Sequence, residues 1–388
     1  MLPVKLRENV YWTGGIDWDL RNFHGYLTQR GSTYNSYLII DEKITLIDTV
    51  KHYLADEMLA RISKIIDPSR IDIIISNHVE MDHSGSIPAV KKIAPRAKIY
   101  TSAPQGEKGL FRHFREKWEF IPVKTGDTLS IGSRTLAFIQ APMVHWPDNM
   151  AVYSSFDNIL FSNDAFGQHY ASSERFDDEC PNDILMHEAK KYYANIVMPY
   201  GAQVQKVLEA LKGIAPDMVA PSHGIVWRKN FTALLESYKK WSLYQNRKYA
   251  CIVYDTMWHT TAKIAQVLEA AFAEKNIPVK MFNLQNTHIS DIITEVLEAE
   301  YICLGSPTLN KNILPTMAAF LAYLKGLAPK NKKSLIFGSW GWGGESLKIL
   351  EAAVQDCGFT VLGEPIGCQY IPDQEELSVM KEKILKSI

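Results

Sequence analysis

The sequence has few cysteines, and their spacing makes no ligand or disulfide pattern. The five are an odd number, they are scattered along the chain, and no two form a CxxC pair: Cys180, Cys251, Cys303, Cys357 and Cys368. A disulfide framework or a thiolate metal site would need paired or clustered cysteines. Buried free thiols are therefore the simpler interpretation.

Long apolar runs and an excess of either charge are also missing. No run approaches the roughly 20 apolar residues that span a bilayer, and the start, MLPVKLRENVYWTGG, lacks the features of an export signal. The 42 basic and 43 acidic side chains give a formal net charge of -1, so no overall field would hold nucleic acid or an anionic membrane. We expect a cytoplasmic protein that acts on small molecules or binds protein partners.

The chain of 388 residues is too long for one hydrophobic core, and its pattern changes near residue 247. Before that point β-rich segments are mixed with helices, which indicates packed sheets with helices outside. The expected strands are 33–40, 43–49, 72–76, 97–102, 135–140, 150–155 and 159–162, and the expected helices are 51–66, 103–114, 200–213 and 231–246.

After residue 247 strands and helices alternate regularly, which is typical of a doubly wound parallel sheet. The expected strands are 249–255, 278–284, 301–306, 334–339 and 360–364, and the expected helices are 260–274, 290–298, 315–326, 344–356 and 373–387. No internal repeat or low-complexity tract is present. The sequence thus predicts two domains, 1–247 and 248–388.

Four ligand-type side chains follow the apolar strand IDIIIS within six residues: His78, Glu80, Asp82 and His83. Residues 78, 80 and 82 would share one side if the strand continued, so the group can converge on a metal; a solvated polar loop is the alternative. His145, Asp164 and His223 each follow an apolar stretch further along the chain. Alone, each could be a hydrogen-bonded loop residue or a cap, but together they predict ligands at strand ends.

The pattern resembles the metallo-β-lactamase superfamily, whose zinc members carry HxHxDH after such a strand. Here glutamate replaces the second histidine, and His78-x-Glu80-x-Asp82-His83 followed by His145, Asp164 and His223 is similar to the signature of flavodiiron proteins, also called A-type flavoproteins. A hard carboxylate oxygen in place of an imidazole nitrogen suits iron better than zinc.

The resemblance implies a two-iron site in a metallo-β-lactamase-like αββα sandwich. One iron would be held by His78, Glu80 and His145, the other by Asp82, His83 and His223, with Asp164 bridging. It also implies that His24, His169 and Tyr193 lie near a pocket for a diatomic substrate and donate hydrogen bonds or protons. Ordinary buried, hydrogen-bonded side chains are the alternative for these three.

Three strand ends in the second half predict a site for FMN. The loop after the first strand enters a helix, whose N-terminus suits a phosphate monoester, and the absence of GxGxxG disfavours a dinucleotide. Backbone amides and tryptophans at the other two strand ends suit an isoalloxazine ring. The predicted contacts are Thr256, Met257, Trp258, His259, Thr260, Thr261, Ser306, Pro307, Thr308, Leu309, Asn310, Ser339, Trp340, Gly341, Trp342, Gly343 and Gly344.

This half resembles a flavodoxin, although His259 stands where free-standing flavodoxins commonly have glycine. The combined resemblance covers essentially the whole chain and implies reduction of O2 to water, of NO to N2O, or of both. It further implies a head-to-tail homodimer or a dimer of dimers. The chain shows no cysteine-rich rubredoxin module, so we expect a separate electron donor, rubredoxin or reduced F420. Two alternatives remain: a zinc hydrolase with an attached flavodoxin module, and an electron carrier that uses FMN alone.

Overall fold

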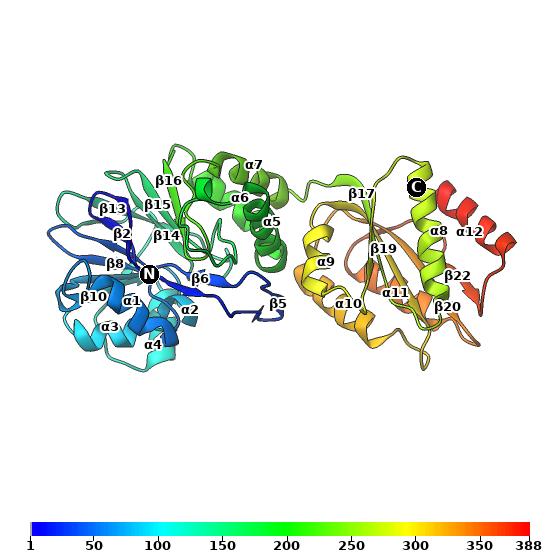
Figure 1. The fold of residues 1–388 in the computed structure, drawn as a ribbon, viewed down its shortest axis with the longest axis horizontal. Helices are drawn as coiled ribbons and strands as arrows, with labels where there is room; N and C mark the ends of the chain where they lie inside the picture. Colours follow the sequence, from blue (N-terminus) through cyan, green and yellow to red (C-terminus); the bar gives the residue numbers. More distant parts are fainter. Residues whose placement is uncertain (1) are drawn as a thin grey trace. The chain divides into compact units, whose positions relative to one another are not determined.

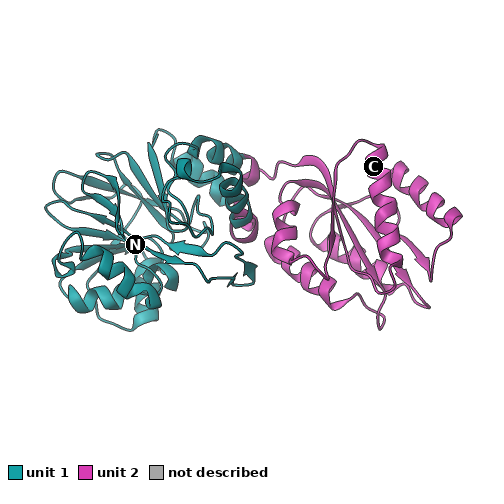
Figure 2. Cartoon of the chain, in the orientation of Figure 1, with its two compact units in different colours: residues 1–192, 202–239 teal, residues 193–201, 240–388 magenta. Residues whose placement is uncertain are grey.

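The structure is a computed structural model that describes residues 2–388. Contacts divide the chain into two compact units (Figure 2). The first unit extends to Tyr192 and includes Ala202–Lys239; the second contains Tyr193–Gly201 and Lys240–Ile388. This division lies a few residues before the predicted boundary at residue 247. Within the described residues, no helix has the length and apolar character needed to cross a membrane.

Two β-sheets form the centre of the first unit (Figure 1). The larger sheet has, in spatial order, β1 (Val4–Arg7), β2 (Val10–Trp12), β7 (Tyr37–Ile39), β8 (Thr45–Ile47), β9 (Ile73–Ser76), β10 (Lys98–Ser102) and β11 (Phe120–Val123). The smaller has β12 (Thr128–Ser130), β13 (Thr135–Gln140), β14 (Met150–Ser154), β15 (Ile159–Asn163) and β16 (Met218–Pro221). Two small hairpin sheets pair β3 (Gly15–Asp17) with β6 (Ser32–Tyr34), and β4 (Asn22–Phe23) with β5 (Tyr26–Leu27).

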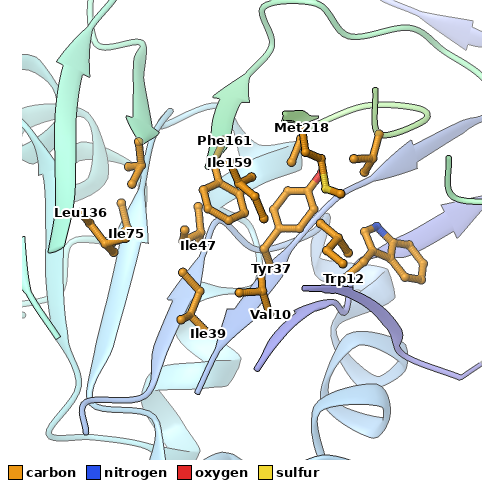
Figure 3. Packing of buried hydrophobic residues seen from close by; sticks show 14 of the residues in the cluster. Val10, Trp12, Tyr37, Ile39, Ile47, Ile75, Leu136, Ile159, Phe161 and Met218 are labelled. Carbon is orange, nitrogen blue, oxygen red and sulfur yellow. The ribbon is translucent and has the colours of Figure 1, made fainter. Parts of the chain in front are cut away.

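Apolar side chains fill the space between the two sheets. Strand β9 shows how, because successive side chains on a strand point to opposite faces. Ile75 packs with Leu136 and Phe161 of the smaller sheet in the cluster shown in Figure 3. Ile74, between the two inward isoleucines of β9, packs instead with residues of the helices on the outer face.

Helices cover the outer faces of both sheets. On the larger sheet these are α1 (Ala55–Ile62), α3 (Ile87–Ile93) and α4 (Gln105–Phe114), which share an apolar cluster with its strands. On the side of the smaller sheet are α5 (Asn182–Tyr192), α6 (Gly201–Ala210) and α7 (Phe231–Ser242) (Figure 1). The predicted αββα sandwich is confirmed.

One predicted strand, 33–40, is wrong in detail because two polar residues interrupt it. Asn35 and Ser36 lie between β6 and β7, and the Asn35 side chain donates hydrogen bonds to the carbonyls of Pro221 (2.7 Å) and Gly224 (3.1 Å). The interruption therefore anchors the loop after β16, which carries one of the predicted ligands.

The second unit is a parallel sheet in the order β18 (Val279–Asn283), β17 (Arg247–Tyr254), β19 (Ala299–Pro307), β20 (Lys333–Trp340) and β21 (Thr360–Val361). Its helices are α8 (Thr260–Glu274), α9 (Ile289–Val296), α10 (Pro315–Leu327), α11 (Glu345–Asp356) and α12 (Gln374–Ser387). Helices α8 and α12 pack against one face through a shared apolar cluster. The doubly wound, flavodoxin-like arrangement is confirmed.

The last strand differs from its predicted range of 360–364. Strand β21 is short, and the chain pairs with β20 again as β22 (Ile366–Gln369). Pro365 stands between them and has no amide hydrogen for the ladder. The strand that reaches the carboxyl edge of the sheet is therefore β22.

Candidate metal centre and flavin pocket

The seven predicted metal ligands come together at the ends of strands in the first unit. His78 and Glu80 follow β9, and Asp82 and His83 lie on the short helix α2 (Met81–Ser84) directly after them. The other three follow β13, β15 and β16: His145, Asp164 and His223. Four separate segments thus supply one site, and His78, Asp82, His83, Asp164 and His223 are all buried.

The ligand atoms form two groups, and within each group they lie within 4.8 Å of one another. The first group is His78, Glu80, His145 and Asp164; the second is Asp82, His83 and His223. The first group offers four ligand atoms and the second offers three, which at this spacing is enough for each group to hold one cation.

Asp164 faces both groups, one oxygen to each. Its Oδ2 lies 3.7 Å from His78 Nε2 and 3.5 Å from His145 Nε2. Its Oδ1 lies 3.0 Å from His83 Nε2 and 3.5 Å from His223 Nε2. A carboxylate placed in this way can bridge two cations.

Several polar atoms of the site are buried and form no hydrogen bond of suitable geometry among the described residues, although some lie close together, as His83 Nε2 and Asp164 Oδ1 do. They include both carboxylate oxygens of Asp82 and of Asp164, and both ring nitrogens of His83. Burying ionised groups costs several kcal/mol each unless they are compensated. Two divalent cations would compensate the three carboxylates, so the residues present fit a two-metal centre.

The mutual influence of these groups appears in their pKa values. Burial alone would lower the pKa of His83, but the charges of Asp82 and Asp164 raise it to about 9. Burial would raise the pKa of Glu80, yet hydrogen bonds from His145 and His78 hold it well below its usual range. The pKa values of His78 and His145 are also raised, so without metal His78, His83 and His145 would carry protons where the cations bind.

Two histidine ligands are oriented by acceptors behind them. Asp148 Oδ2 accepts a hydrogen bond from His78 Nδ1 (2.9 Å) and another from the amide of Val79 (2.7 Å). The carbonyl of Thr33 accepts one from His223 Nδ1 (2.8 Å). Both bonds turn Nε2 toward the metal position. The sequence prediction missed Asp148, although an acid three residues after a ligand histidine is a usable signal.

Two of the three predicted pocket residues lie beside the metal centre. His24 is exposed at the rim, where its Nε2 lies 3.1 Å from Glu80 Oε1. His169 is buried, with its ring centroid 4.9 Å from that of His223. Its Nδ1 lies 2.7 Å from Ser32 Oγ, while its Nε2 forms no hydrogen bond in the described part of the chain.

Tyr192, not Tyr193, is the tyrosine that the structure places there. The ring of Tyr192 lies 5.2 Å from His169 and 5.9 Å from His223, whereas the ring of Tyr193 lies 5.2 Å from Trp241 in the second unit. Neighbouring residues at a helix end point about 100° apart, so only one of the pair can face the site. The sequence alone could not choose between adjacent tyrosines.

In the second unit a cavity of about 650 Å³ opens at the carboxyl edge of the sheet. This volume is within the range of cofactor sites. Twelve of the residues predicted to bind FMN line it: Met257, Trp258, Thr260, Pro307, Thr308, Leu309, Asn310, Ser339, Trp340, Gly341, Trp342 and Gly343.

The other five predicted contacts do not line the cavity. Thr261 is buried and its Oγ1 lies 2.9 Å from Ser339 Oγ, which ties the loop to β20. Ser306 is buried and donates a hydrogen bond to the Pro307 carbonyl. Gly344 lies at the start of α11, where a Cβ would meet the Trp340 ring at 3.3 Å. The remaining two, Thr256 and His259, belong to the loop before α8.

That loop fits a phosphate. Thr256 Oγ1 is buried and forms no hydrogen bond in residues 2–388, and the amides at the start of α8 are the groups that bind anions at helix N-termini. His259 has φ +62°, a left-handed conformation that glycine adopts at least cost.

Four cavity residues were missed by the sequence prediction: Lys311, Glu345, Tyr370 and Ile371. Tyr370 and Ile371 directly follow β22, so the misplaced last strand hid them. Both are strongly exposed, as are Trp258 and Trp342.

Two family models match the chain in the expected order. The model described as ODP family beta lactamase matches residues 33–224, and the flavodoxin model matches residues 252–381.

Similar proteins match over nearly the full length. A nitric oxide reductase from Moorella thermoacetica is 41% identical, with 97% of this chain and 95% of the relative covered. The structure of the rubredoxin oxygen:oxidoreductase from the anaerobe Desulfovibrio gigas has a TM-score of 0.97 at 40% identity, covering 100% of this chain and 97% of that one. The flavodiiron protein from Giardia intestinalis has a TM-score of 0.96 at 33% identity, covering 100% and 96%.

Proposed function

The chain belongs to the flavodiiron proteins, and from this premise we propose that it reduces dioxygen to water, nitric oxide to N2O, or both. The enzyme is an oxidoreductase with two non-haem irons and FMN. One observation supports the proposal above others: Asp164 directs one oxygen to each of two ligand groups. Such a pair of sites suits a two-electron reaction centre rather than a single structural metal.

Each iron would be held by the ligands of its own group, with Asp164 shared. His78, Glu80 and His145 would hold the first, and Asp82, His83 and His223 the second. Glu80 favours iron, because a carboxylate occupies the place where zinc members of the superfamily have histidine. FMN would lie in the cavity of the second unit, with its phosphate at Thr256 and Thr260.

When bound, the irons and FMN supply the electrons, and the protein supplies position and protons. Reduction of O2 to two waters takes up four protons, and reduction of two NO to N2O and water takes up two. His24 is exposed and can exchange protons with solvent at the rim. Burial and the nearby His223 hold the pKa of His169 well below its usual range, so this imidazole stays neutral and can donate one hydrogen bond from a nitrogen. Tyr192 is the third side chain that we propose for this role, beside His24 and His169.

We also propose how electrons arrive. A separate donor, rubredoxin or reduced F420, would reach the flavin at the exposed edge formed by Trp258, Trp342, Tyr370 and Ile371. A head-to-tail homodimer or a dimer of dimers would pair the flavin of one subunit with the irons of its partner. The two functional domains would be 1–247 and 248–388. The five cysteines form no disulfide within residues 2–388, which favours a reducing, cytoplasmic location.

One experiment tests the function directly. The purified protein is analysed for iron, zinc and FMN, then reduced without oxygen and mixed with O2 or NO in a stopped-flow instrument. Two irons and one FMN per chain, with rapid reoxidation by either gas, are expected. Zinc with esterase activity and no reoxidation would instead establish the hydrolase, and FMN without metal would establish the electron carrier.

The glutamate is the residue to change in the same assay. Glu80→His should lower the iron content and the turnover together, because it restores the ligand type that zinc prefers. Retention of both would contradict the ligand assignment.

The dimer has its own test. A Glu80→Ala subunit lacks a metal ligand, and a subunit with the Thr260 loop deleted lacks the phosphate site. Mixing the two inactive proteins should restore part of the activity if electrons pass between chains. No recovery, with mixed dimers present by mass spectrometry, would argue against exchange.

A further inference from the structure

A buried carboxylate that is not a predicted ligand lies beneath the metal centre. Asp48 follows β8, is 2% exposed and has φ +52°. A residue other than glycine rarely adopts this left-handed conformation, and its cost persists only where surrounding contacts impose it. The contacts of Asp48 are with residues that precede metal ligands.

The first of these contacts is with the residue before His78. Asp48 Oδ1 accepts a hydrogen bond from the amide of Asn77 (2.7 Å), and its Oδ2 accepts one from Asn77 Nδ2 (2.9 Å). This two-point attachment fixes the position where the chain leaves β9 and enters the ligand segment.

Two more ligand segments meet the same oxygen. Asn163, which precedes Asp164, directs Nδ2 to Asp48 Oδ2, and Ser222, which precedes His223, directs Oγ to it, each at 3.5 Å. Asn163 and Ser222 are also bonded to each other, because Asn163 Nδ2 donates a hydrogen bond to Ser222 Oγ (3.0 Å).

The remaining ligands are attached one step further away. Thr49 donates to the carbonyl of His83 from both its amide (2.8 Å) and its Oγ1 (2.6 Å). Asn149, in the loop that carries His145, donates from Nδ2 to Asn163 Oδ1 (2.8 Å). The end of β8 thereby connects all four segments that supply ligands.

Burial raises the pKa of Asp48, but the hydrogen bonds from Asn77 and Asn163 lower it and favour the ionised carboxylate. Every group that faces its oxygens is a donor: Ser222 Oγ already accepts from Asn163, so its hydrogen points to Asp48. Four donors face the two oxygens, so a protonated carboxyl would bring a fifth hydrogen into this site with no acceptor for it. No lysine or arginine of the described residues forms an ion pair with it, so its charge acts on the nearby metal centre in a medium of low dielectric.

We propose that Asp48 is a positioning residue of the diiron centre, which aligns the ligand-bearing segments and adds a negative charge beside the irons. The inference rests on the proposed function, since it assumes that the two ligand groups hold iron. Three ligand carboxylates leave a diferrous pair with one net positive charge. A further buried anion favours the more highly charged oxidised pair and so lowers the reduction potential of the irons.

Two substitutions separate alignment from charge. Asp48→Asn keeps the shape of the side chain. Asn77 Oδ1 has no hydrogen-bond partner in the structure among the described residues, so the side-chain amide of Asn77 can turn and accept a hydrogen bond from the new amide at position 48. Asp48→Ala removes both the contacts and the charge. The matched control is Asp157→Asn: Asp157 is a buried carboxylate of the same unit, bonded to Arg134 and Ser154 at the opposite end of β15 from Asp164.

Redox titration of the iron-loaded proteins, followed by electron paramagnetic resonance, should show a more positive potential for Asp48→Asn than for the wild type. Asp157→Asn should leave the potential unchanged. In competition with a chelator, Asp48→Ala should retain iron about 10- to 100-fold less well than Asp157→Asn, with FMN content unchanged. Loss of iron from a folded Asp48→Asn protein would also support the proposal that Asp48 aligns the ligand-bearing segments.

An unshifted potential in Asp48→Asn would overturn the charge effect. Equal iron retention in Asp48→Ala and Asp157→Asn would overturn the alignment, and if Asp48→Ala does not fold, retention by Asp48→Asn decides in its place. Failure of the proposed function looks different, because the wild-type protein itself would then bind no iron.

Discussion

The metal centre and the flavin cavity are built in opposite ways. At the metal centre the side chains themselves form the site, and they are buried: the side chains of His78 and His83 are 0% exposed. At the flavin cavity the loops form the site, and its aromatic side chains lie open, with Trp258 85% and Trp342 92% exposed. The first site is specified by residue identity and the second largely by backbone course.

This difference predicts how each site responds to substitution. A buried ligand is surrounded by groups that depend on it, so removing it leaves charges without compensation. A loop residue that contributes an amide can be exchanged as long as the backbone keeps its conformation. Large effects are therefore expected in the first unit and smaller ones in the second.

The largest effect is expected from Asp164→Asn. The amide has only one oxygen and no charge, so it cannot compensate cations in both ligand groups. Iron content should fall, and turnover with O2 or NO should decrease more than about 100-fold. This loss is larger than the loss of about 10- to 100-fold that is typical when the changed residue only contacts a metal ligand. Metal analysis and oxygen-electrode assays measure this, and FMN content serves as the internal control. Retained turnover would show that Asp164 does not bridge.

The next effect concerns the protein without metal. The raised pKa of His83, about 9, stabilises the fold below its ordinary value of 6.5 and is lost as pH rises toward 9. The lowered pKa values of Asp82 and Asp164 act in the other direction: their stabilisation is present above about pH 4 and is lost as pH falls. The metal-free first unit should therefore be most stable near pH 5 to 6.5.

From pH 6.5 to 9 we expect the metal-free first unit to lose up to about 3 kcal/mol. The iron-loaded protein should not show this loss, because the cations take the place of the protons. Calorimetry of chelator-treated and iron-loaded samples across this range distinguishes the two. A flat profile for the metal-free protein would show that the site relaxes when it is empty.

The third effect is that of Asp148, which holds His78 from behind. Asp148→Asn keeps one oxygen that can accept from both His78 Nδ1 and the Val79 amide, but it removes the negative charge that strengthens these two hydrogen bonds. Iron affinity or turnover should fall about 10- to 100-fold, less than for Asp164→Asn. Iron retention in a chelator competition measures it, and an unchanged value would mean that His78 is held by its neighbours alone.

The same contrast explains what could be predicted from sequence. The seven residues that the structure gathers into two possible ligand groups could be predicted because metal chemistry restricts residue type. The parallel sheet of the second unit could be predicted because periodicity reports burial. Asp148 and Asp48 were not predicted, since their roles arise from contacts between segments distant in sequence. Tyr370 was missed because strand β22 is short and follows Pro365.

In the flavin cavity a moderate effect is expected from Thr256→Val. The side chain keeps its shape but loses the Oγ1 that is buried without a hydrogen bond. If that oxygen binds the phosphate, FMN affinity should fall about tenfold, as for a hydrogen bond to a charged group, while the flavin-free protein should be no less stable. Thr261→Val is the comparison: it breaks a bond to Ser339, so it should destabilise the flavin-free protein instead. Fluorescence titration with FMN and denaturant unfolding measure both.

The smallest effect is the most specific to backbone. His259 adopts φ +62°, which costs an L-residue about 1–2 kcal/mol. Glycine removes this cost, but it also increases the conformational entropy of the unfolded chain, which offsets part of the gain in stability. His259→Gly should therefore stabilise the second unit by about 0.5–1 kcal/mol and leave FMN affinity unchanged. His259→Ala, which keeps the Cβ, should give no gain. Loss of FMN from both variants would mean that the imidazole itself binds the cofactor, and the cavity would then be specified by side chains, as the metal centre is.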